Sequence, residues 1–122
     1  MKYFRTLVLA ALACVFAAAS ASAHAFLDHA VPAVGATVSG SPGEIELVFT
    51  QDIVPAFSGA EILVAGGGAV PSAKAAASAG NPAALRLRLG QALKSGVYIV
   101  NWHVVSVDTH RSSGSYKFTV AP

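Results

Sequence analysis

Residues 96–105 read GVYIVNWHVV, and this stretch decides the fold that we expect for the chain. Every second residue in it is large and apolar: Tyr98, Val100, Trp102 and Val104. Side chains of an extended chain point alternately to opposite sides, so these four would share one face. The pattern predicts a strand at Val97–Val105, with Tyr98 and Trp102 in a hydrophobic core.

Shorter stretches elsewhere in the chain show the same alternation. Their apolar residues are Ile45, Leu47 and Phe49, then Leu85, Leu87 and Leu89, then Tyr116, Phe118 and Val120, with one more short strand expected at Glu61–Ala65. Glycine, proline, serine and asparagine separate these stretches, as turns require. Because no segment shows a long 3.6-residue period, we expect an all-β sandwich or barrel. The alanine-rich piece Ala73–Ala79, between Pro71 and Gly80, is expected to be a loop rather than a helical turn.

Much of the hydrophobic content lies at the start of the chain. The 122 residues are 54% hydrophobic and 11% charged, which fits one domain and excludes an intrinsically disordered chain. Met1–Arg5 is positively charged, Leu7–Ala19 is continuously apolar, and Ser20–Ala23 consists of small residues. This pattern predicts a secretory signal peptide at residues 1–23, cleaved after Ala23. The alternative is a transmembrane anchor, but a bilayer core needs about 20 apolar residues and this run is shorter.

Cleavage would change the chemistry of the chain. The cysteine and the methionine, Cys14 and Met1, lie in the signal peptide, as do Lys2 and Arg5. Residues 24–122 then form one domain with six basic residues, six acidic residues and no sulfur. We therefore expect no nucleic-acid partner, no membrane span after cleavage, and a fold stabilised by its core rather than by disulfides.

Two features of the mature chain suit a metal ion. His24 would be its first residue, and an N-terminal histidine offers both its α-amine and its imidazole Nδ1 to one metal. Asp108 and His110 stand two residues apart after the central strand, so in an extended chain their side chains point the same way. Each feature also has a plainer explanation. His24 would be an accidental first residue, and Asp108 a loop-capping aspartate beside a surface histidine.

The motifs also occur in a specific combination. Gly96–His110 matches G-x-Y-x-V-x-W-x-V-V-S-x-D-x-H, and Gly114–Val120 matches G-x-x-x-F-x-V. These are the carboxy-terminal patterns of the CopC-type periplasmic copper-binding family, which the chain resembles. His24–Leu27 is similar to the mature amino terminus of that family, and Ile45–Thr50 is similar to one of its strands. The resemblance covers nearly the whole chain after the signal peptide.

The resemblance implies a fold and a metal site. The fold would be an immunoglobulin-like Greek-key β-sandwich or barrel of roughly seven strands. Transferred residue by residue, the ligands of one Cu(II) ion per chain would be the α-amine and imidazole of His24, the carboxylate of Asp108 and the imidazole of His110. Three nitrogens and one oxygen suit the tetragonal geometry of Cu(II). The resemblance also implies a periplasmic location and, for some members, delivery of copper to an inner-membrane transporter.

Two departures from the family pattern bear on the metal. Some members carry a Met-rich loop for Cu(I), but the matching region here, Val64–Pro71, has no methionine. Thioether and thiolate sulfur are the donors that favour Cu(I), so we expect a Cu(II)-only protein. Gln51 stands where certain members have an acidic residue, and we leave it out of the ligand set.

Three further side chains lie near these motifs in the sequence. His29 is close enough to the amino terminus to reach the metal, whereas His103 is expected at the surface, on the face opposite Trp102. Arg111 either orients a carboxylate or is a solvated loop side chain.

We therefore expect a monomeric Cu(II) carrier or buffer in copper homeostasis or resistance, and not an enzyme. An N-terminal histidine paired with another histidine also resembles the histidine brace of oxidative polysaccharide-cleaving enzymes. In this chain, however, Asp108 would complete four equatorial ligands and leave no open position there for oxygen. A third possibility is a metal-free immunoglobulin-like interaction module, which would follow if the signal peptide were cut elsewhere and the amine chelate lost.

Overall fold

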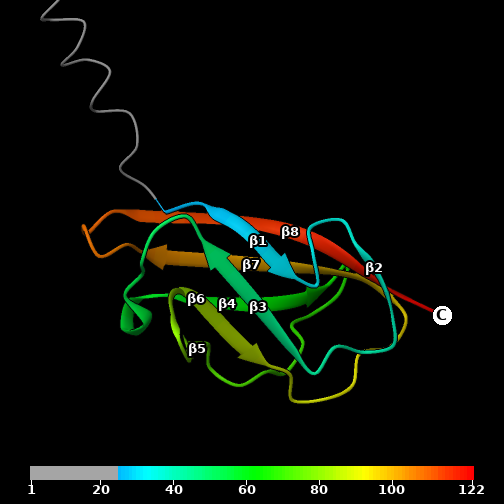
Figure 1. Ribbon diagram of the computed structural model, residues 1–122. Coiled ribbons are helices and arrows are strands. Elements are labelled where there is room, and N and C mark those ends of the chain that lie inside the picture. Colours follow the sequence, from blue (N-terminus) through cyan, green and yellow to red (C-terminus); the bar gives the residue numbers. More distant parts are fainter. Residues whose placement is uncertain (1–24) are drawn as a thin grey trace, which may run out of the picture.

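The predicted central strand is β7 (Gly96–Val105), which pairs along its whole length with β8 (Arg111–Ala121). Figure 1 shows a computed structural model, which describes residues 25–122. His24 and the predicted signal peptide of residues 1–23 lie outside the described residues. The other elements are β1 (Leu27–Val31), β2 (Thr37–Ser39), β3 (Glu44–Phe49), the 3-10 turn η1 (Pro55–Phe57), β4 (Gly59–Val64), β5 (Ala76–Ser78) and β6 (Asn81–Arg88).

Two four-stranded sheets pack against each other (Figure 1). One has the strand order β1-β3-β6-β5 and the other β2-β8-β7-β4. Neighbouring strands are antiparallel except for β2 and β8, which run parallel. The immunoglobulin-like all-β sandwich is thus confirmed, and residues 25–122 form eight strands in place of the roughly seven expected. Within residues 25–122, no helix is long and apolar enough to cross a membrane.

Three short strands differ from the sequence interpretation. β1 and β2 precede the first alternating stretch and were not predicted from it. β5 lies inside Ala73–Ala79, so the loop predicted there is wrong for Ala76–Ser78. The backbone of β5 pairs with β6 although its own residues are small, because pairing with a neighbouring strand outweighs weak strand preference.

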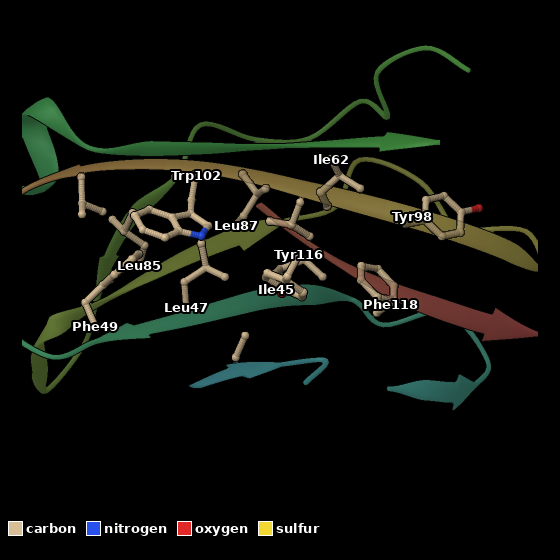
Figure 2. Packing of buried hydrophobic residues seen from close by; sticks show 14 of the residues in the cluster. Ile45, Leu47, Phe49, Ile62, Leu85, Leu87, Tyr98, Trp102, Tyr116 and Phe118 are labelled. Atoms are coloured by element: carbon tan, nitrogen blue, oxygen red, sulfur yellow. The ribbon is translucent and has the colours of Figure 1, made fainter. Parts of the chain in front are cut away.

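The inner faces of the two sheets form the hydrophobic core (Figure 2). Tyr98 and Trp102 are buried in it, as predicted. Trp102 meets Phe49 of the opposite sheet edge-on, with ring centroids 5.2 Å apart, and Tyr98 stacks with Phe118 at 5.6 Å. Burial continues past the end of β7, since Ser106 is also fully buried. The connection from β7 to β8 therefore begins at a buried residue, Ser106.

Candidate metal centre

The turn that joins β7 to β8 is built on Ser106. The Ser106 N–H donates to the carbonyl of His110 at 2.9 Å, and the Thr109 N–H donates to the carbonyl of Ser106 at 2.8 Å. Thr109 has a φ of 74°, in the left-handed region that a β-branched residue rarely adopts. The hydrogen bonds of Ser106 hold this conformation, which returns the chain so that Asp108 and His110 lie on the same turn.

The structure brings Asp108 and His110 into contact. Nδ1 of His110 lies 3.2 Å from Oδ1 of Asp108, and the two side chains are 46% and 42% exposed. The Ser106 hydroxyl donates to the same carboxylate oxygen and also lies 3.2 Å from the carbonyl of His110. An anionic oxygen and an imidazole nitrogen thus face one another at a surface that an ion can reach.

The surroundings of Asp108 favour its anionic form. Its pKa lies below the ordinary value, chiefly because the Ser106 hydroxyl donates to the carboxylate. Partial loss of water opposes this shift, whereas the nearby His110 adds to it. At neutral pH the carboxylate is therefore ionised, and no proton competes with a cation for it.

The start of the described chain is attached to the same end of the sandwich. The Phe26 N–H donates to Oγ1 of Thr50 at 3.0 Å, and the Thr50 N–H returns a bond to the Phe26 carbonyl at 2.8 Å. Two residues further on, the carbonyl of Asp52 accepts the Val107 N–H at 3.1 Å. Residues 50–52 thus link the beginning of the chain to the turn, and Figure 1 shows both at one end of the molecule. His24 precedes Ala25 in the chain and lies outside the described residues.

The structure does not bring the other predicted side chains to this turn. Nδ1 of His29 lies 2.7 Å from a carboxylate oxygen of Asp28, its neighbour on β1. His103 is exposed on the outer face of β7, as predicted. Within residues 25–122, no three His, Cys, Asp or Glu side chains are grouped to hold a metal, so neither histidine joins Asp108 and His110. Of the predicted ligands, the structure therefore brings together Asp108 and His110, and His24 lies outside the described residues.

Sequence reasoning missed the role of Ser106. This residue is part of the quoted W-x-V-V-S-x-D-x-H motif, where its spacing to the aspartate was the available signal. Its hydroxyl, buried and directed at Asp108, fixes the carboxylate in place. Gln51 is half-buried within the segment that links Phe26 to Val107.

The chain is similar to known proteins over nearly all of its described length. Residues 27–121 match the family model described as the CopC domain. Copper resistance protein C of Xanthomonas campestris pv. juglandis is 40% identical over 114 residues, which cover 89% of this chain and 89% of the relative. Copper transport protein CutJ of Bacillus subtilis (strain 168) is 25% identical over 120 residues, 98% of this chain but 22% of CutJ.

Solved structures show the same sandwich. CopC from Methylosinus trichosporium OB3b has a TM-score of 0.75 and 36% identity, with 81% of this chain and 95% of that chain covered. PcoC, a methionine-rich copper resistance protein from Escherichia coli, has a TM-score of 0.74 and 32% identity, with 80% and 99% covered. Nearly the whole of each solved chain is therefore matched.

Proposed function

Because the chain belongs to the CopC family, we propose that it is an exported protein that binds Cu(II) and carries or sequesters it in copper homeostasis or resistance. The observation that carries this proposal is the contact between Asp108 and His110 at the β7–β8 turn. The turn lies within the segment that matches the family model, and copper resistance protein C is a relative by name. The export signal predicted at residues 1–23 would place the protein in the periplasm.

The proposed ligands are the α-amine and imidazole of His24, the carboxylate of Asp108 and the imidazole of His110. Ala25, the residue after His24, is fully buried, and the next residue, Phe26, bonds to Thr50, two residues before the Asp52 carbonyl that accepts from Val107. That position supports a reach from His24 to Asp108 and His110. His24 would add two nitrogen donors to the carboxylate of Asp108 and the imidazole of His110, which have no third His, Cys, Asp or Glu beside them in residues 25–122. The resulting three nitrogens and one oxygen suit tetragonal Cu(II).

The proposed oxidation state rests on the donor atoms. Residues 24–122 contain neither methionine nor cysteine, whereas PcoC is described as methionine-rich. Cu(I) favours soft sulfur ligands, and nitrogen with carboxylate oxygen favours Cu(II). We infer that this chain holds one Cu(II) and has no separate Cu(I) site.

Competition with a chromophoric copper chelator tests the ligand set. Asp108→Asn and His110→Ala are each expected to lower the Cu(II) affinity of the mature protein by at least about tenfold. His29→Ala and His103→Ala are the matched controls, since they remove the other two histidines, and should change the affinity less than twofold. Equal affinities for all four variants would contradict the site.

A carrier function is favoured over an enzymatic one because Asp108 would occupy the fourth equatorial position on the metal. Oxygen chemistry requires an open position, which this set does not leave there. The copper-loaded protein is therefore expected to consume reductant and oxygen no faster than free copper does in the same buffer. Sustained turnover that depends on the loaded protein would favour the oxidative enzyme.

We further propose that the copper acceptor is an inner-membrane transporter. CutJ, a copper transport protein, contains a segment similar to this whole chain, which supports an association between the two functions. Phe26 and Val107 lie within two residues of proposed ligands in the sequence and are 58% and 61% exposed, and we propose that the transporter contacts them.

Copper uptake into inner-membrane vesicles from the source cells tests this transfer. The double variant Phe26→Ser and Val107→Ser should keep its Cu(II) affinity but deliver copper more slowly. Val97→Ser is the control, because Val97 is an exposed valine near the other end of β7. Equal delivery by the double variant and the control would contradict a role for this surface.

A further inference from the structure

A second candidate site lies on the outer face of the β7–β8 pair, away from the core. A hollow of about 710 Å³ opens there to solvent, within the size range of small-molecule sites. Its lining includes Phe57, His103, Val105, Thr109, Arg111 and Ser113. The lining contains no acidic residue, whereas it has a guanidinium, an imidazole and hydroxyl groups.

The imidazole of His103 lies against a glycine of the neighbouring strand. A Cβ atom at Gly59 of β4 would lie 2.8 Å from Cε1 of His103, so the ring rests against the Gly59 backbone. Neither ring nitrogen has a hydrogen-bond partner in the described part of the chain. The same ring borders a smaller hollow of about 400 Å³, where Glu61 and Asn101 also lie. Within the described residues, His103 thus presents ring nitrogen atoms without a hydrogen-bond partner to both hollows.

Arg111 is a second unused polar group at the hollow. No carboxylate of residues 25–122 lies within 4.0 Å of its guanidinium, in contrast to Arg86, which pairs with Glu46 at 3.1 Å. In the β7–β8 register His103 lies opposite Ser113, and Val105 lies opposite Arg111. Arg111 is therefore the diagonal neighbour of His103 on the same face, a separation that long side chains span.

We propose that this hollow binds a small organic carboxylate. The Arg111 guanidinium pairs with the carboxylate, for which its planar fork of N–H donors is suited. The His103 ring and the Ser113 hydroxyl donate to the same group, and Phe57, with 67% of its surface exposed, covers the apolar part of the ligand together with Val105. The site uses none of the proposed copper ligands, so it stands or falls independently of the copper site.

Titration of the metal-free exported protein with sodium benzoate, followed by ¹H–¹⁵N NMR, tests the proposal. We expect saturable shifts of the amides of Thr109, Arg111 and Ser113. Acetate and inorganic phosphate, which lack a large apolar part, should bind at least tenfold more weakly than benzoate. Shifts that do not saturate, or equal binding of benzoate and phosphate, would overturn the proposal.

Variants separate a built site from general attraction of anions. Arg111→Gln is expected to weaken benzoate binding at least tenfold, and His103→Ala several-fold, with unchanged unfolding midpoints. Lys117→Gln is the matched control, since Lys117 is an exposed cation on the same strand and face but outside the hollow. An equal loss in Arg111→Gln and Lys117→Gln would show only nonspecific charge attraction and would overturn the assignment.

Discussion

On each face of β7 an aromatic ring lies against a glycine of the neighbouring strand, but one ring is buried and the other is exposed. On the inner face the Trp102 ring lies over Gly114 of β8, where a Cβ atom would come within 2.6 Å of Cζ2. On the outer face the next residue, His103, lies over Gly59 of β4 at 2.8 Å. Trp102 is 7% exposed and packs against Phe49, whereas His103 is exposed and borders two hollows. The ring beside a glycine therefore fills the core on the inner face, whereas on the outer face it presents a polar group to solvent.

The largest expected effect comes from removing the two rings in turn. Trp102→Ala should lower the free energy of unfolding by about 3–5 kcal/mol, because it leaves a cavity in the core. His103→Ala should change it by less than about 0.5 kcal/mol, because the ring is at the surface. Urea unfolding of both variants measures the difference. A similar decrease in the free energy of unfolding for both variants would contradict the difference between the buried Trp102 and the exposed His103.

Adding a methyl group to each glycine gives a smaller contrast. Gly114→Ala should destabilise the fold by about 1–3 kcal/mol, because the buried Trp102 ring has no room to move. Gly59→Ala should cost less than about 0.5 kcal/mol, because the exposed His103 ring can rotate away. The Gly59 variant should instead shift the ring NMR signals of His103. An unfolding midpoint lowered more by Gly59→Ala than by Gly114→Ala would contradict the comparison.

The smallest expected effect concerns the turn where β7 ends. Ser106→Ala removes the hydroxyl that donates to Asp108, so the pKa of Asp108 should rise toward its ordinary value of 3.8. A carboxyl pKa that is lower in the folded chain stabilises the fold above the ordinary pKa, and this contribution is lost as pH falls through the lowered pKa. The free energy of unfolding of Ser106→Ala should therefore decrease less than that of the wild type as the pH falls below about 4.

Carboxyl ¹³C NMR of the metal-free protein measures the Asp108 titration directly. Ser113→Ala is a suitable control, because it removes a serine hydroxyl of β8 that makes no bond to Asp108. An Asp108 pKa that is the same in the wild type and in Ser106→Ala would show that the hydroxyl has no such role.

The fold was predictable where alternation was long and its apolar residues large, as in β7. β5 was not, because Ala76 and Ala77 carry little hydrophobic signal and their pairing depends on β6. Asp108 and His110 were expected to point the same way along an extended chain, but the structure brings them together through a turn in which Thr109 is left-handed and Ser106 bonds to Asp108. The contact of His103 with Gly59 joins strands distant in sequence, so no local pattern indicated it.

The central claim is that His24, Asp108 and His110 together hold one Cu(II). Its most direct test is electron paramagnetic resonance of the exported protein, whose start at His24 is verified by intact mass, beside the same chain with one alanine added before His24. The account predicts one tetragonal Cu(II) per chain with three nitrogens and one oxygen, and loss of this spectrum in the extended chain and in the double variant Asp108→Ala and His110→Ala. An identical spectrum from all three proteins would contradict it.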